Sequence, residues 1–259
     1  MRSGKIYRDI ILFILLCSAL IWMGWRGGDT LAYNWHWRQI PQYFFRSVDG
    51  SIVTGQLVYG LIVTLKVIGL SLVWAGFFGL ATALLRLSSS LVGQVIARVY
   101  LETIRNTPLL VQIFFLYFVM APILDIGRFS TAVLALSVFE GAYVSEIIRS
   151  GIVSIDRGQW EASFSLGLSR TETYIKIILP QALRRILPPL TSQTISLVKD
   201  SALVSTIAVY DLTMEGRAII AETFLTFEIW FTVAAIYLFM ALIVSLLVAC
   251  LEKYYPLRT

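Results

Sequence analysis

The sequence contains few of the residues that enzymes use for catalysis. Of its 259 residues, two are cysteine and one is histidine. It has neither an H-E-x-x-H metal motif nor the G-x-x-x-x-G-K-[ST] loop that cradles nucleotide phosphates. His36 has no metal-ligand neighbours, and Cys17 and Cys250 stand alone in apolar segments, where cysteine usually behaves as a small hydrophobic residue. We therefore expect no catalytic site, metal, disulfide or bound cofactor. If ATP drives this protein, a separate subunit is expected to bind it.

Charged side chains are also scarce. They make up 14% of the chain, against 58% hydrophobic residues, and the mean hydropathy is +0.78. This composition indicates an integral membrane protein, in which each spanning helix needs about 20 apolar residues. We predict six spans, near residues 10–25, 60–85, 103–122, 129–149, 187–208 and 228–250. They leave little of the chain for a soluble domain.

The first 55 residues are expected to form an N-terminal anchor helix and an external aromatic segment. Tyr33, Trp35 and Trp37 are amphipathic aromatic residues, which favour the headgroup level, and this predicts an interfacial helix there. A cleaved secretory signal is the alternative, but the end of the first apolar run lacks the usual small-x-small cleavage site. Residues 56–259 hold the other five predicted spans and a polar loop at about 150–186.

The net charge of +5 follows a topological pattern. With the N-terminus inside, 14 of the 21 Lys and Arg residues fall in inner segments and 5 in outer segments. This asymmetry agrees with the positive-inside rule and predicts that both termini and the loop at 150–186 are cytosolic. The basic residues orient the protein in the membrane, so we do not infer a nucleic-acid partner.

The polar loop is predicted to begin with a short helix. Asp156 and Gln159 have the spacing of a capping box. Trp160 and Phe164 share one helical face and form a candidate apolar anchor for a partner. Gly167 is placed to adopt the left-handed conformation that ends a helix, and we expect both this turn and a close approach to require a missing side chain.

A second short helix is predicted directly after it. Ser169 and Glu172 repeat the capping-box spacing, and Pro180 is expected to end the helix. The same pattern also fits an ordinary amphipathic connector lying on the membrane, and the residues alone leave both interpretations open.

Several motifs around this loop occur in the order found in one transporter family. Glu161-Ala162-Ser163, Gly167 and Ile177-x-Leu179-Pro180 resemble the EAA loop of permease subunits in ATP-binding cassette importers, with only Ser163 departing from the pattern. The flanking segments resemble the polar amino acid branch of that family: Arg105 to Gln112, Ala142-Tyr143, Glu146, Gly158-Gln159 and Lys199-Asp200. The resemblance covers roughly residues 56–255.

The resemblance implies an all-α integral membrane protein with the type I importer permease fold, in the bacterial inner membrane. It implies ATP-binding cassette ATPase subunits, a second permease subunit (identical or paralogous) and an extracytoplasmic amino-acid-binding protein as partners. It also implies that a short coupling helix docks in a cleft of the ATPase. The candidate ATPase-coupling residues are Arg157, Gln159, Trp160, Glu161, Ala162, Ser163, Phe164, Gly167, Leu179 and Pro180.

Ionisable residues inside the predicted spans form a second candidate site, because a charge in the bilayer generally faces the bundle interior or water. The candidate substrate-path residues are Gln193, Ser196, Lys199, Asp200, Glu102, Arg105, Thr107 and Glu140. Lys199 and Asp200 are expected to find partners on other helices, with Glu102, Arg105 and Glu140 as candidates. An ion network that only holds the helices in register is the structural alternative.

Glu102 and Arg105 are three residues apart, so they can bond across one helical turn. Pro108 is expected to kink or restart the third span. In the resembled family this region lines the passage, and Arg105 could attract a substrate carboxylate or simply neutralise Glu102.

The predicted function is therefore a non-catalytic permease subunit of an ATP-driven importer for polar amino acids, with acidic or general L-amino acids as the narrower expectation. The alternative is an ion-coupled secondary transporter or channel that uses Lys199, Asp200 and Glu140. That alternative leaves the capped polar loop without a role.

Overall fold

A computed structural model describes residues 2–30, 33–48 and 50–254. The chain forms two compact units, Met1–Gln39 and Ile40–Thr259. In the first unit, α1 (Arg2–Thr30) contains the predicted first span. After it, the rings of Trp35 and Trp37 stack with their centroids 5.8 Å apart.

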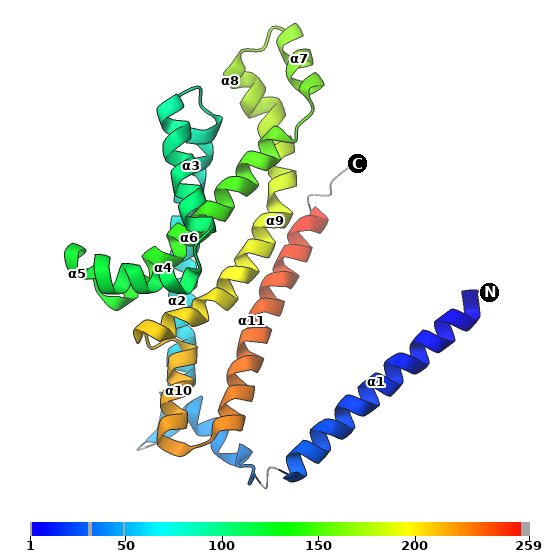
Figure 1. Ribbon diagram of the computed structural model, residues 1–259, viewed down its shortest axis with the longest axis vertical. Helices are drawn as coiled ribbons and strands as arrows, with labels where there is room; N and C mark the ends of the chain where they lie inside the picture. The colour runs from blue at the N-terminus through cyan, green and yellow to red at the C-terminus, as the bar shows by residue number, and fades with distance from the viewer. Residues whose placement is uncertain (1, 31–32, 49, 255–259) are drawn as a thin grey trace. The chain divides into compact units, whose positions relative to one another are not determined.

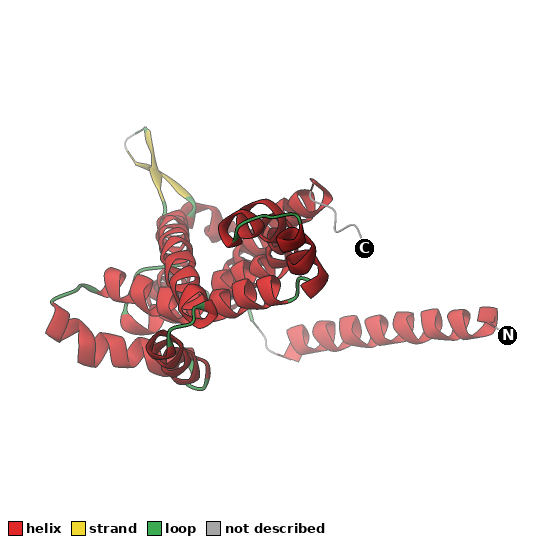
Figure 2. Cartoon of the chain, turned by 90° about the horizontal axis from the view of Figure 1, so that it is seen from above, coloured by secondary structure: helices red, strands yellow, loops and turns green. Residues whose placement is uncertain are grey.

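A 3-10 turn and a hairpin occupy the place of the predicted interfacial helix. Residues Trp37–Tyr43 form the 3-10 helix η1, followed by antiparallel strands β1 (Phe45–Val48) and β2 (Ser51–Thr54). Gly50 takes a φ of +80° at the turn between the strands. Figure 2 shows this hairpin as the one strand-containing part of the described chain. The helical part of this segment is therefore η1, and its location at the membrane interface stays a prediction from the aromatic composition.

The helices of the second unit are mostly long. In chain order they are α2 (Gln56–Leu87), α3 (Leu91–Arg105), α4 (Leu109–Phe115), the π-helical turn η2 (Leu116–Met120), α5 (Ala121–Leu124), α6 (Arg128–Val153), α7 (Arg157–Ser165), α8 (Arg170–Thr173), the π-helical turn η3 (Tyr174–Ile178), α9 (Leu179–Asp200), the 3-10 helix η4 (Ser201–Ile207), α10 (Leu212–Thr223) and α11 (Thr226–Tyr254). Figure 1 shows α2, α6, α9 and α11 along the length of this unit, with α7 and α8 at one end and α10 at the other.

Three helices in the described residues are long and apolar enough to cross a membrane: α2, α6 and α11. A fourth span is possible if α3 and the helix at Leu109–Leu124 count as one broken span. The helix α9 carries two arginines, a lysine and an aspartate. Six spans therefore stay a prediction.

The predicted third span at 103–122 is not a single straight helix. Its two halves meet at an angle of 106°. The helix α3 ends at Arg105, and a new helix begins after Pro108, as expected for a residue that lacks a backbone N–H. The second half extends sideways from the long helices (Figure 1).

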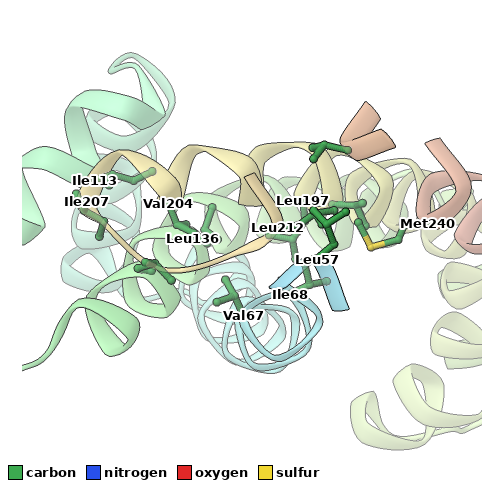
Figure 3. Packing of buried hydrophobic residues seen from close by; sticks show 14 of the residues in the cluster. Leu57, Val67, Ile68, Ile113, Leu136, Leu197, Val204, Ile207, Leu212 and Met240 are labelled. Atoms are coloured by element: carbon green, nitrogen blue, oxygen red, sulfur yellow. The ribbon is translucent and has the colours of Figure 1, made fainter. Parts of the chain in front are cut away.

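The core lies where α2, α6 and α9 meet η4 and α10. Figure 3 shows Leu57 and Val67 of α2 gathered there with Leu136 of α6, Leu197 of α9 and Leu212 of α10. The helices α2 and α6 approach closely because small residues line their contact. A Cβ added to Gly79 would lie 2.4 Å from the Val144 Cγ1 atom. This packing positions the ends of α6 and α9, between which the polar loop is placed.

Candidate functional site: the α7–α8 loop and the polar residues of the helices

The loop between α6 and α9 comprises residues 154–178, here called the α7–α8 loop. Its first helix begins as predicted at an Asp156 N-cap, whose Oδ1 accepts from the Gly158 backbone N–H at 2.6 Å. The predicted capping box with Gln159 does not form. The Gln159 side-chain Oε1 instead accepts from Gln181 Nε2 of α9 at 3.2 Å, so Gln159 joins α7 to α9.

The end of α7 is a Schellman motif centred on Gly167. The Gly167 N–H donates to the Phe164 carbonyl at 2.9 Å, and the Leu168 N–H donates to the Ser163 carbonyl at 3.1 Å. Gly167 has a φ of +78°, which confirms the predicted left-handed turn. Among the described residues, no atom lies within 4 Å of an added Cβ, so the predicted close approach stays a prediction for a partner.

The second helix has the predicted capping box. Ser169 Oγ accepts from the Glu172 N–H, and Glu172 Oε2 accepts from the Ser169 N–H at 3.1 Å. Lys176 donates to the other Glu172 oxygen at 2.9 Å. Together with the bonds to Ser169, this contact lowers the pKa of Glu172 from 4.5 to about 2.

Pro180 does not end this helix, contrary to the prediction. The residues before it form the π-helical turn η3, in which the Leu179 N–H bonds back five residues to the Tyr174 carbonyl. Pro180 then occupies the first turn of α9, where a missing N–H is tolerated. The loop is therefore continuous with α9.

Trp160 packs against other residues of the loop and of α9. Its ring lies edge-on to Tyr174, with the centroids 4.8 Å apart, and it packs against a small core of Ile155, Ile178, Ala182 and Ile186. Trp160 therefore fixes α7 against η3 and α9. Because the ring is only half-buried, its predicted contact with a partner stays a prediction.

The loop exposes apolar side chains at the end of α7 and in η3. At the end of α7, Phe164 is 44% exposed and Leu166 is 81% exposed, and Ile175 of η3 is 60% exposed. Leu166 had no place among the predicted residues, although an apolar residue beside a helix-ending glycine could have indicated it. The other predicted coupling residues that are exposed are Arg157, Gln159, Glu161, Ala162, Gly167, Leu179 and Pro180. Ser163 is buried, and its Oγ donates to the Gln159 carbonyl at 2.6 Å.

The predicted substrate-path residues fall into separate groups. Glu140 is 1% exposed, and its Oε2 accepts from Gln193 Nε2 at 2.7 Å. Its Oε1 has no hydrogen-bond partner among the residues that the structure describes. Both side chains line a cavity of about 410 Å³ between α2, α6 and α9, with Thr194 as the other polar residue and otherwise apolar walls. The structure thus brings Glu140 and Gln193 together.

Arg105 and Glu102 do not bond to each other as predicted. Glu102 Oε2 accepts from Asn106 Nδ2 at 2.9 Å, whereas Arg105 lies 3.8 Å from Glu146 Oε2. Glu146 also pairs with Arg86 and with Arg149, so one carboxylate holds three guanidinium groups from α2, α3 and α6. Glu146 is not among the predicted site residues, although its i,i+3 spacing to Arg149 indicates an ion pair.

Polar contacts stabilise the break between helices α3 and α4. Thr107 Oγ1 donates to the Thr103 carbonyl at 2.9 Å. Gln112 Nε2 donates across the break to the Ile104 carbonyl and to Thr107 Oγ1, both at 2.8 Å. Arg105 and Asn106 line a polar hollow beside Tyr143.

Lys199 and Asp200 lie at the C-terminal end of α9. Lys199 is exposed, and Ser196 and Asp200 are half-buried. Within residues 50–254, no ion pair joins either residue to Glu102, Arg105 or Glu140. The spacing of residues within one helix could not predict which side chains of other helices lie near Lys199 and Asp200.

Comparisons with known proteins agree with this architecture. A family model described as "Binding-protein-dependent transport system inner membrane component" matches residues 75–255. The glutamine transport system permease protein GlnP of Escherichia coli (strain K12) is 40% identical over 200 residues, which cover 76% of this chain and 91% of that protein. The L-cystine transport system permease protein TcyB of Bacillus subtilis (strain 168) is 35% identical over 226 residues, covering 86% of this chain and 93% of that protein.

A solved structure with a similar fold is described as a crystal structure of an amino acid ABC transporter with histidines. It matches with a TM-score of 0.72 and 39% identity, over 77% of this chain and 94% of that chain.

Proposed function

The chain belongs to the family of binding-protein-dependent transport system inner membrane components, and we propose that a separate ATPase drives it through the α7–α8 loop. It is a membrane permease subunit of an amino acid importer, as its relatives and its structural neighbour indicate. The family consists of transporter subunits that act with an ATPase and a substrate-binding protein. Catalysis of ATP hydrolysis is assigned to the partner, since this sequence has no phosphate-binding loop.

The observation that carries this proposal is the geometry of the α7–α8 loop. A capped helix, a Schellman turn and a second capped helix make the loop a defined body, and its exposed end presents Phe164 and Leu166. A docking surface of this kind combines an apolar centre with a charged rim, to which Arg157 and Glu161 contribute. Leu179 and Pro180 then connect the loop to α9.

We assign the substrate path to the polar residues of the helices. Glu140 and Gln193 provide a buried polar pair beside a cavity. Glu102, Arg105 and Thr107 lie near the break between α3 and α4, and Ser196, Lys199 and Asp200 lie in the last turns of α9. A second permease, identical or paralogous, would complete the path around a shared axis.

The excess of Lys and Arg in alternate segments supports a topology with both termini and the α7–α8 loop in the cytosol. The substrate class that we propose is polar amino acids. Two relatives are named for glutamine and cystine, which favours uncharged polar amino acids over the acidic ones. None of these findings favours an ion-coupled transporter or channel.

Reconstitution tests the proposal. Proteoliposomes would contain this chain with its ATPase and binding protein, and a Leu166→Cys variant would carry a cysteine crosslinker to the ATPase. We expect ATP-dependent uptake of a polar amino acid and a Leu166 crosslink to the ATPase. Uptake by the chain alone under a proton or sodium gradient, without the crosslink, would overturn it.

A further inference from the structure

Arg185 joins the two long helices that flank the α7–α8 loop. Its Nη1 donates to the Ser154 carbonyl and, at 3.0 Å, to the Ser154 Oγ. Ser154 is the C-cap of α6, and Arg185 lies in the second turn of α9. The last carbonyls of a helix lack partners inside the helix and carry the negative end of its dipole. The guanidinium therefore supplies a donor and a positive charge where α6 needs both.

Apolar packing accompanies this contact. A Cβ added to Gly151 of α6 would lie 2.3 Å from the Ile186 Cγ1 atom of α9, so the two helices touch directly beside Arg185. Ile155 and Ala182 belong to the same small buried cluster. Apolar contacts of this kind are not directional, and they permit the two helices to slide or twist. The charge-assisted bonds from Arg185 to two Ser154 oxygens have a defined geometry and oppose such movement.

We propose that Arg185 is a positioning residue that fixes the base of the α7–α8 loop, so that displacement of α7 moves α6 and α9 together. This inference rests on the proposed role of the loop in ATPase coupling. The bond from Gln181 to Gln159 links α9 to α7, and the Trp160–Tyr174 contact closes the loop internally. Without the Arg185 contact, a force on α7 can be absorbed by separation of the end of α6 from α9.

The experiment uses the complete reconstituted transporter and three variants. Arg185→Ala removes the contact, and Arg185→Lys keeps the charge and one donor. Arg184→Ala is the matched control, because Arg184 is the adjacent exposed arginine and makes no hydrogen bond to the loop within residues 50–254. For each variant, we would measure the ATPase that co-purifies, the rate of ATP hydrolysis and the amino acid taken up per ATP hydrolysed.

We expect Arg185→Ala to reduce uptake per ATP about fivefold, equivalent to about 1 kcal/mol, while ATPase recruitment stays at the wild-type level. Arg185→Lys should recover part of the uptake per ATP, and Arg184→Ala should show the wild-type uptake per ATP. A wild-type ratio in Arg185→Ala overturns the inference, and so does a loss of ATPase recruitment in that variant, because the residue would then serve docking or folding. Absence of the Leu166→Cys crosslink in the protein that retains Arg185 would instead contradict the proposed function itself.

Discussion

Replacement of Gly167 by valine tests whether the Schellman turn supports ATPase binding. The residue has a φ of +78°, and an added Cβ would meet no atom within 4 Å. The substitution therefore adds backbone strain without a steric clash in this chain. For a residue other than glycine, the left-handed conformation costs about 1–2 kcal/mol, which corresponds to a factor of about 5–30 in an equilibrium constant.

If the ATPase binds the loop in its observed conformation, binding must supply this strain energy. We expect Gly167→Val to weaken ATPase association by about that factor, and uptake to fall with it at limiting ATPase. Gly167→Asn should retain most of the affinity, since asparagine enters the left-handed region more readily. The assay is co-purification over a range of ATPase concentrations in mild detergent, followed by uptake in proteoliposomes.

Gly50 provides the matched control for this experiment. It has a φ of +80°, also has no atom within 4 Å of an added Cβ, and lies in the hairpin between β1 and β2. Gly50→Val introduces the same kind of strain far along the sequence from the loop, so ATPase affinity should not change. Equal losses in Gly50→Val and Gly167→Val, or wild-type affinity in Gly167→Val, would refute the reasoning.

Two further predictions concern charged groups. Glu146→Gln leaves three guanidinium groups without a carboxylate and should destabilise the protein by about 1–3 kcal/mol, the cost of unpaired polar groups. Tryptophan fluorescence during thermal unfolding in detergent would measure this. An unchanged midpoint, equal to that of the control Glu102→Gln, would contradict it. Because the folded-state pKa of Glu172 is lowered to about 2, the stability that its ionised form adds is complete above the unfolded pKa near 4.5 and is lost as pH falls through about 2. Carboxyl ¹³C NMR of labelled glutamate should show that Glu172 has an unusually low pKa and that this pKa rises in Lys176→Met. If Glu172 titrates near 4.5 in the unmodified protein, the capping box does not hold in solution.

Features fixed within one or two turns could be predicted from the sequence. The Asp156 N-cap, the Ser169–Glu172 capping box and the left-handed Gly167 each depend on neighbouring residues and on backbone groups that every helix end leaves unpaired. The restart of the chain after Pro108 is of the same kind. These short-range rules, together with the spacing of the family motifs, were sufficient to identify the α7–α8 loop.

Contacts between distant segments could not be predicted in this way. Arg105 pairs with Glu146, 41 positions along the sequence, whereas spacing alone suggested Glu102. Gln193 reaches Glu140 across 53 positions. The bend of 106° after α3 also depends on where α4 packs. Each of these results depends on which helices become neighbours, and periodicity within one helix carries no information on that choice.

Two features of the loop depart from the local rules applied to the sequence, and they affect how the loop should act. Trp160 was expected to face a partner and Pro180 to end a helix. Instead, Trp160 packs on Tyr174, and the π-helical turn η3 lets the helix pass through Pro180 into α9. In both cases contacts within the folded loop override a local rule. The proposed partner surface is centred on the end of α7, at Phe164 and Leu166. A contact there acts on a loop that is continuous with α9 and bonded to the end of α6 through Arg185, so it can displace the membrane helices without first ordering the loop.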